Sequence, residues 1–143
     1  LARLVEGRSV EWLAPGGIGL ARSEGALAEE EIFGPVLALE ECAVLDDALE
    51  WVRARPHPLA IYLFGATAQE EARVAGATKS GAIVCDRGVE YAAIMALPFG
   101  GVGGSGFGRR NGEAGFREFS NLRARVQHGR WSLSRLFDRP QSD

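Results

Sequence analysis

The stretch "DDALEWVRARPHPLAIYLFGATAQEEARVAGATKSGAIVC", residues 46–85, alternates between helical and strand patterns. In residues 46–55 acids come first and arginines last, an order that suits the dipole of a helix. Leu45, Leu49 and Val52 also fall on one helical face. The next run, "LAIYLF" at 59–64, is continuously apolar and rich in β-formers, as expected of a strand buried on both faces.

Further helices and strands are predicted before and after this helix and strand. Thr67 and Glu70 form a T-x-x-E capping box, which predicts a second helix ending near Gly76. "AIVC" at 82–85 reads as a further strand, and "VLAL" at 36–39 as one that precedes the first helix. Strand, helix, strand, helix, strand at this spacing predicts right-handed crossovers, and therefore an α/β fold with a parallel sheet and flanking helices.

The composition is that of an ordinary soluble globular domain. The chain has 143 residues, of which 46% are hydrophobic and 24% charged, with a formal net charge of -3. This charge gives no reason to expect a nucleic-acid partner. No apolar run reaches the roughly 18–20 residues of a membrane span, and Cys42 and Cys85 have no metal-type spacing. We therefore expect no metal site, no disulfide and a cytoplasmic location.

Two stretches are rich in glycine. "APGGIGLA" at 14–21 reads as a loop. In "LPFGGVGGSGFGRR" at 97–110, three glycines satisfy the G-x-G-x-x-G pattern of a dinucleotide site: Gly101, Gly103 and Gly106. However, a dinucleotide site requires that the pattern follow a strand, open a helix and precede an acid about 20 residues later. This loop instead follows Leu97-Pro98, runs into "RRNGE" and has no suitably placed acid. A loop packed too closely against other backbone for side chains is the better interpretation, and its Phe99 suggests the wall of a site.

Four segments together resemble one family. They are "EEIFGPVL" at 30–37, "PLAIYLF" at 58–64, "SGAIV" at 80–84 and "LPFGGVGGSGFGRRNGEAGFREFS" at 97–120. In order and spacing they resemble the C-terminal part of NAD(P)-dependent aldehyde dehydrogenases, and most of all the class 3 and coniferyl-aldehyde branch. The resemblance covers roughly residues 28–120. It implies a part of an enzyme that oxidises an aldehyde to a carboxylic acid, with NAD or NADP as cofactor.

The resemblance assigns a cofactor role to Glu31 and Phe33. In this family the matching glutamate accepts hydrogen bonds from the hydroxyls of the nicotinamide ribose, and a carboxylate suits a diol because it has two acceptor oxygens. Phe33 is implied to lie against the ribose and nicotinamide, on a backbone that Gly34 and Pro35 then turn and stiffen. The alternative for Glu31 is a solvated charge within the acidic run 29–31.

The same resemblance implies that Phe99 lines the aldehyde pocket. Tyr91, Ile94 and Met95 occupy the segment that approaches the substrate entrance in this family. Ordinary packing is the alternative for each of these side chains, and for the last three it is the favoured one.

The family's catalytic cysteine has no counterpart here. It belongs to a "GQ-x-C" segment well upstream of "EIFGP", and neither Cys42 nor Cys85 has that setting, so we expect both to be small buried residues. The resemblance thus implies a C-terminal fragment with no catalytic residue of its own and without the adenine-binding half. We expect four parts: a partial catalytic α/β segment at 1–81, an oligomerisation strand at 82–96, a glycine-rich active-site loop and short helix at 97–120, and a tail at 121–143. The short helix of the third part is expected around 113–119.

Two further hypotheses remain beside an aldehyde-oxidising parent, which we expect to be a homo-oligomer, a dimer or a tetramer. One is an inactive truncated module that associates with a full-length subunit through the strand at 82–96, whose exposed edge would be sticky alone. The other is a family member that reduces acyl phosphates or acyl-CoA, against which the class 3 character of the middle segments argues.

Overall fold

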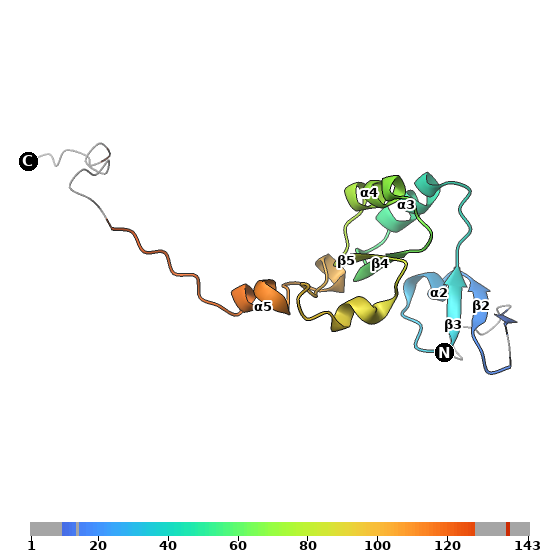
Figure 1. The fold of residues 1–143 in the computed structure, drawn as a ribbon. Helices are drawn as coiled ribbons and strands as arrows, with labels where there is room; N and C mark the ends of the chain where they lie inside the picture. The colour runs from blue at the N-terminus through green and yellow to red at the C-terminus, as the bar shows by residue number, and fades with distance from the viewer. Residues whose placement is uncertain (1–9, 14, 128–136, 138–143) are drawn as a thin grey trace, which may run out of the picture. The chain divides into compact units, whose positions relative to one another are not determined.

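The computed structural model describes residues 10–13, 15–127 and 137 (Figure 1). It divides the chain into two compact units, Leu1–Arg55 and Pro56–Asp143. In the part of the chain that is described, no helix has the length and apolar character needed to cross a membrane.

The first unit contains a three-stranded sheet in the order β1-β2-β3. β1 (Glu11–Trp12) runs antiparallel to β2 (Gly19–Arg22), and β2 runs parallel to β3 (Val36–Leu39). The short helix α2 (Ala26–Glu29) lies in the connection between the two parallel strands. Its Leu27 is buried together with Ala21 of β2 and Val36 of β3, so the core of this unit forms where α2 meets the sheet.

Helix α3 (Leu45–Arg53) follows β3 and agrees with the helix predicted at 46–55 to within two residues. Leu49 is its buried residue. At its C-terminal end the Arg53 Nε donates to the Leu49 carbonyl at 3.2 Å, and the Arg55 Nη1 donates to the Trp51 carbonyl at 3.0 Å. These arginines satisfy carbonyl groups of the last turns, which is where positive charge stabilises a helix.

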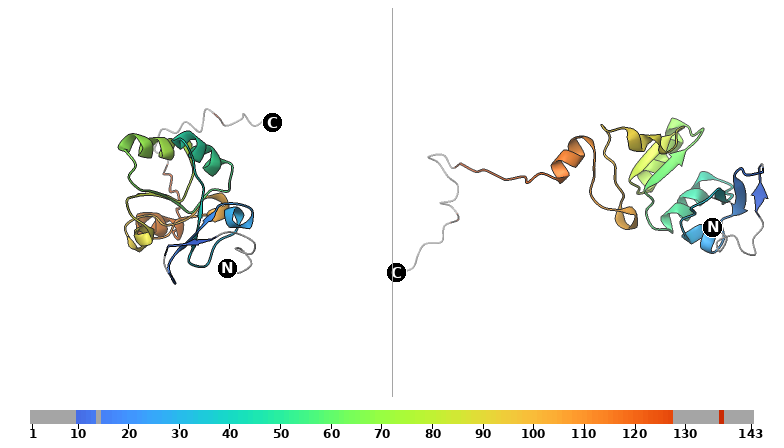
Figure 2. Two further views of the ribbon diagram at one scale, coloured as in Figure 1. Left: turned by 90° about the vertical axis from the view of Figure 1, so that its right-hand side faces the viewer. Right: turned by 90° about the horizontal axis from the view of Figure 1, so that it is seen from below.

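The second unit contains a parallel pair of strands, β4 (Ala60–Leu63) and β5 (Ala82–Cys85), with Ala60 opposite Ala82. Helix α4 (Ala68–Ala77) joins them and lies to one side of the pair (Figure 2). Both predicted strands and the predicted helix between them are thereby confirmed.

The first turn of α4 is fixed by the predicted capping box. The Thr67 amide and hydroxyl both donate to the Glu70 Oε2 at 2.8 Å, and the Glu70 amide donates back to the Thr67 Oγ1 at 3.3 Å. The bond from the Thr67 backbone, followed by the bond from its hydroxyl, holds the pKa of Glu70 below its ordinary value of 4.5. The box therefore contributes stability above that ordinary pKa and loses it as the pH falls through the lower, folded-state pKa.

We expect Thr67→Ala to destabilise α4, because an N-cap hydroxyl contributes about 0.5–2 kcal/mol. Hydrogen exchange of the α4 amides should be faster in this variant at neutral pH, and the difference from the parent sequence should shrink as the pH falls below the folded-state pKa of Glu70. Thr67→Ser keeps the hydroxyl and should restore protection. An unchanged exchange rate in Thr67→Ala would contradict a stabilising role for the box.

The strand pairing differs from the single predicted sheet. β3 pairs with β2 rather than with β4, so the three predicted strands are divided between two sheets. The partner strand β2 lies partly within residues 14–21, which the sequence analysis interprets as a loop, and that interpretation is wrong from Gly19 onward. A Cβ at Gly19 would lie 2.6 Å from the Val10 Cγ1, so glycine there reflects close packing inside a strand.

The predicted extended segment at 82–96 is also shorter than expected. β5 ends at Cys85, and the 3-10 helix η1 occupies Val89–Ala93. The strand stops at Asp86, which has a φ of 53° and whose Oδ1 accepts a hydrogen bond from the Gly65 amide at 2.8 Å. The prediction that 59–64 is buried on both faces is likewise wrong for the described residues, since Leu59, Tyr62 and Phe64 are exposed.

The predicted tight glycine loop is confirmed. It contains the 3-10 helix η2 (Gly103–Ser105) and leads to helix α5 (Gly112–Glu118), which agrees with the short helix predicted around 113–119. A Cβ at Gly101 would collide with the Ser105 carbonyl, and one at Gly100 with the Gly108 carbonyl. The loop thus brings backbone against backbone, as the packing interpretation requires.

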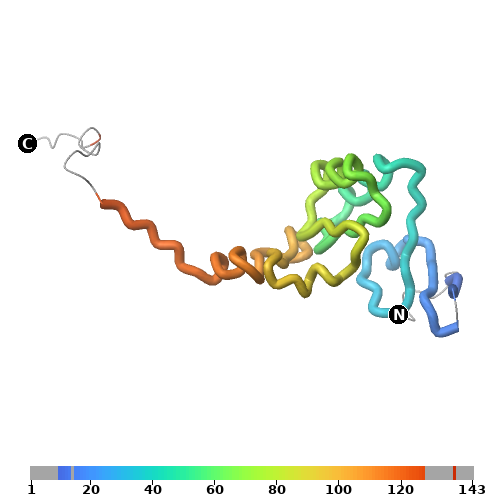
Figure 3. The backbone as a smooth tube through the Cα atoms, viewed as in Figure 1, coloured from blue at the N-terminus to red at the C-terminus, as the bar shows by residue number. Residues whose placement is uncertain are grey.

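The surface at the end of this unit is strongly apolar. Residues 121–127 follow α5 without helix or strand (Figure 3), and the remainder of the predicted tail, apart from Phe137, lies outside the described residues. Phe107 is 97% exposed. Four more apolar side chains nearby in sequence are exposed as well: Phe116, Phe119, Leu122 and Val126.

Candidate functional site

Glu31 and Phe33 lie in the irregular segment between α2 and β3. Ile32 between them packs against the buried cluster of the first unit, so the side chains on either side of it are exposed. The Gly19 amide of β2 donates to the Pro35 carbonyl at 2.7 Å, which ties the turn after Phe33 to the sheet. Ile32 between the two side chains and Pro35 after them therefore anchor the backbone that presents them.

The exposed pair consists of a hydrogen-bond acceptor and an aromatic ring. Phe33 is 82% exposed. Among the described residues, the Glu31 carboxylate has no hydrogen-bond or ion-pair partner, so both of its oxygens are available to accept. A free carboxylate two residues from a free flat ring fits a sugar diol attached to a planar heterocycle, which is the shape of a nicotinamide riboside.

Tyr91 is a packed residue of the second unit. It is buried in η1, stacks on Phe99 with ring centroids 5.5 Å apart, and meets the ring of Tyr62 edge-on at 6.2 Å. Burial, followed by the neighbouring Tyr62, raises the pKa of Tyr91, so its phenol stays protonated at neutral pH. Tyr91 is therefore packed, whereas Met95 is 67% exposed and Ile94 is also exposed.

Phe99 is held at the base of the glycine loop. Its amide and carbonyl form two hydrogen bonds of 2.8 Å with the carbonyl and amide of Arg110, and the Arg110 guanidinium lies 4.5 Å from the centre of its ring. The Arg109 Nη1 donates to the carbonyls of Gly101 and Gly108, both at 2.7 Å, which closes the loop across its width. The sequence analysis missed both arginines, although "RR" directly after the glycines was a visible signal.

The structure therefore brings Tyr91 and Phe99 together but leaves Met95 apart from their stack. Glu31 and Phe33 belong to the unit Leu1–Arg55, and the three others to the unit Pro56–Asp143.

Comparison with known proteins agrees with this arrangement of motifs. The sequence profile of the Aldehyde dehydrogenase family matches residues 14–124, most of the chain. The chain belongs to the aldehyde dehydrogenase family. The predicted family is thereby confirmed, and the matched range includes Glu31, Phe33, Tyr91, Met95 and Phe99.

Two curated relatives show which branch of the family is similar. The chain is 39% identical over 113 residues to aldehyde dehydrogenase family 3 member B3 of Mus musculus, covering 79% of this chain and 24% of the relative. It is 42% identical over 99 residues to a probable coniferyl aldehyde dehydrogenase of Caulobacter vibrioides, covering 69% of this chain and 20% of the relative. The chain thus spans about a quarter or less of these relatives.

Solved aldehyde dehydrogenases share the fold. The substrate-bound state of Staphylococcus aureus AldH superposes with a TM-score of 0.66 at 33% identity, covering 78% of this chain and 26% of that one. The P. syringae indole-3-acetaldehyde dehydrogenase AldA, solved in complex with NAD+ and IAA, gives 0.62 at 26% identity, covering 73% and 21%. These likenesses confirm the predicted α/β class.

Neither cysteine of this aldehyde dehydrogenase chain has the setting of a nucleophile. Cys85, at the end of β5, is partly buried, and burial followed by the carboxylates of Glu71 and Asp86 raises the pKa of its thiol. A reactive cysteine requires the opposite shift. Cys42 is exposed, so its predicted burial is wrong: the segment between β3 and α3 runs over the surface. Among the described residues, no group of histidine, cysteine and acidic side chains could hold a metal ion.

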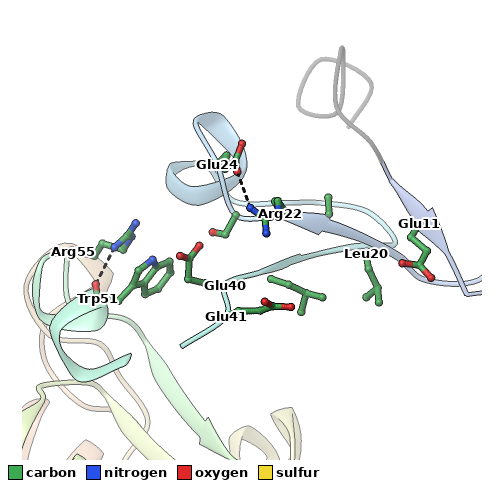
Figure 4. Close-up of a pocket in the computed structure, with 11 residues that line it drawn as sticks. Glu11, Leu20, Arg22, Glu24, Glu40, Glu41, Trp51 and Arg55 are labelled. Atoms are coloured by element: carbon green, nitrogen blue, oxygen red, sulfur yellow. Dashed lines mark hydrogen bonds and ion pairs between the residues drawn. The ribbon is translucent and has the colours of Figure 1, made fainter. Parts of the chain in front are cut away.

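One cavity of the aldehyde dehydrogenase chain lies apart from the predicted site residues. It is an open groove of about 800 Å³ in the first unit, lined by acids and two arginines around Trp51 (Figure 4). The Arg55 guanidinium stacks on Trp51 at 3.6 Å, and the exposed Arg22 and Glu24 approach to 3.7 Å. Exposed pairs of this kind contribute little, and none of the predicted site residues lines the groove.

Proposed function

We propose that this chain is the part of an aldehyde dehydrogenase that holds the nicotinamide ribose and forms one wall of the aldehyde pocket. The whole enzyme would oxidise an aldehyde to a carboxylic acid with NAD or NADP. The observation that carries the proposal is the exposed pair Glu31 and Phe33 on either side of the packed Ile32, within the range that matches the family.

Glu31 holds and orients the coenzyme in this proposal. Its two carboxylate oxygens accept hydrogen bonds from the two ribose hydroxyls, and each charge-assisted bond contributes on the order of 1.5–3 kcal/mol. Phe33 adds an aromatic contact of about 0.5–1.5 kcal/mol beyond the area it buries. The bound coenzyme supplies the hydride acceptor. The two side chains limit its rotation, which matters because transfer requires a defined approach to the substrate.

Phe99 contributes the wall of the aldehyde pocket. Tyr91 supports the ring from behind by stacking, so its role is to position Phe99 rather than to exchange a proton. Met95, exposed after η1, is available at the entrance to the pocket. The nucleophile and the dinucleotide cradle belong to parts of the enzyme that this chain does not contain. We also propose a cytoplasmic homo-oligomer, a dimer or a tetramer, as the form of the enzyme.

The proposed function is tested with the purified full-length enzyme. We expect reduction of NAD+ or NADP+ that depends on an added aldehyde, with one carboxylic acid formed for each reduced coenzyme. Use of both coenzymes in parallel decides between them. If an acyl phosphate or acyl-CoA oxidises the reduced coenzyme and no aldehyde is oxidised to an acid, the proposal is wrong and the reductase hypothesis holds.

A second candidate function is association without catalysis. Within the described residues β4 and β5 have one neighbour each, so the outer edges of both strands are open to a further strand. A truncated module would use such an edge to bind a full-length subunit. Light scattering of the chain mixed with the full-length enzyme separates the two functions, since a stable mixed complex with a chain that oxidises no aldehyde alone favours the module.

A further inference from the structure

We propose that Arg110 is a specificity-determining residue that binds a carboxylate, or another anionic group, carried by the aldehyde substrate beside Phe99. This inference rests on the proposed function, because it takes Phe99 as a wall of the aldehyde pocket. It goes beyond that function by naming a substrate class. The observation behind it is that the Arg110 guanidinium lies 4.5 Å from the centre of the Phe99 ring.

The guanidinium donors of Arg110 are not used within the described part of the chain. Its backbone pairs with Phe99, but its guanidinium has no hydrogen-bond or ion-pair partner among those residues. Two other arginines of the same unit are engaged. Arg109 donates to two loop carbonyls, and Arg117 contacts the Glu113 carboxylate at 2.6 Å. Arg110, a cation with free N–H donors, therefore lies beside Phe99, the residue that the family resemblance places in the substrate pocket.

The contact with the Phe99 ring leaves the donors of Arg110 accessible, because this side chain is exposed. A guanidinium is planar, and its five N–H groups point outward in that plane. When its face covers an aromatic ring, the ring occupies the face and the N–H edge remains free. That edge matches the two oxygens of a carboxylate. The backbone bridge to Phe99 and the contact with its ring also restrict the side chain, so less entropy is lost when a carboxylate binds.

The surroundings favour a ligand with an apolar body and an anionic end. Arg110 lines a cavity of about 520 Å³ whose apolar walls are Leu59, Phe99, Phe107 and Phe119. The other charged groups that line it are Arg109 and Glu118. Because the lining carries two cations and one anion, and Arg109 is engaged by carbonyls, Arg110 is the group with a charge to offer to an anion.

The test compares para-carboxybenzaldehyde with para-methylbenzaldehyde as substrates of the full-length enzyme. The two are similar in shape and differ in the negative charge. We expect Arg110→Gln to lower the ratio of their kcat/KM values by roughly 10- to 100-fold, which corresponds to one charge-assisted hydrogen bond. The loss should appear mainly in the KM of the carboxylated aldehyde. Arg110→Lys, which keeps the charge but not the fork, should retain part of the preference.

The ratio is insensitive to the fraction of enzyme that is folded, because both substrates report on the same active molecules. Arg117→Gln is the matched control, since it removes an exposed arginine of the same unit that already has an acidic partner, and its ratio should stay at the parental value. An enzyme that oxidises both aldehydes with the same ratio in Arg110→Gln overturns this inference alone. A full-length parent enzyme that oxidises no aldehyde at all overturns the proposed function as well.

Discussion

Replacement of Glu31 by glutamine in the full-length enzyme is expected to slow hydride transfer by roughly 10- to 100-fold, the value of one charge-assisted hydrogen bond. Glutamine keeps the shape of the side chain but loses the charge and exchanges one acceptor for a donor. The ribose is then held less firmly, and the nicotinamide samples orientations that do not react. The fold should be unaffected, because Glu31 is exposed and has no partner among the described residues.

Single-turnover formation of the reduced coenzyme measures this step directly. With a deuterated aldehyde, the isotope effect should rise in Glu31→Gln, because hydride transfer becomes the slow step. Glu29→Gln is the matched control, since it removes the same charge two residues earlier from the exposed end of α2. Unchanged turnover in Glu31→Gln would remove this residue from the coenzyme site, and an equal loss in Glu29→Gln would indicate a general effect of charge.

The second large effect is expected from Gly81→Ala. Gly81 precedes β5, and a Cβ there would collide with the Gly100 carbonyl and lie 2.5 Å from the Leu59 carbonyl oxygen. Both obstacles are backbone, so they cannot rotate away as a side chain could. We expect a loss of about 3 kcal/mol in the free energy of unfolding, at the upper end of the range for overpacking. Activity should fall as well, because the collision pushes the loop that carries Phe99 away from β4.

Gly76→Ala separates this collision from the general effect of adding a methyl group. Gly76 lies in α4 with no atom within 4 Å of the added Cβ. Alanine is the better helix former there, and we expect a gain of about 0.5–1 kcal/mol. Denaturant unfolding of both variants provides the comparison. Similar midpoints for the two would show that the backbone of Gly81 does not approach Gly100 as closely as the structure indicates.

The elements that sequence could predict are those whose signals are local. The charge order of residues 46–55, the pair Thr67 and Glu70, and the apolar run at 59–64 each report on their immediate neighbours along the chain. β2 was missed because its pairing with β3 is a long-range contact, and because Gly19 looks like a loop residue until its contact with Val10 is known. The end of β5 depends in the same way on the hydrogen bond between Asp86 and Gly65.

In the candidate site, too, local sequence signals were predictable and long-range contacts were not. The motif alone indicated Glu31 and Phe33, and the structure adds that Ile32 between them is packed while both are exposed. The stack of Tyr91 on Phe99 joins side chains that no spacing rule connects. Arg109 and Arg110 acquire their contacts only when the loop closes, so a sequence reader sees two adjacent cations and nothing to distinguish them.

The exposed apolar side chains near α5 have a consequence for the life of the polypeptide in a cell. Phe107, Phe116 and Phe119 present the kind of surface that chaperones bind and that directs unfinished chains to degradation. The survival of newly made molecules would then depend on how soon another protein surface shields these rings. Substitutions that delay this shielding would reduce the amount of protein without touching a residue that contacts coenzyme or aldehyde.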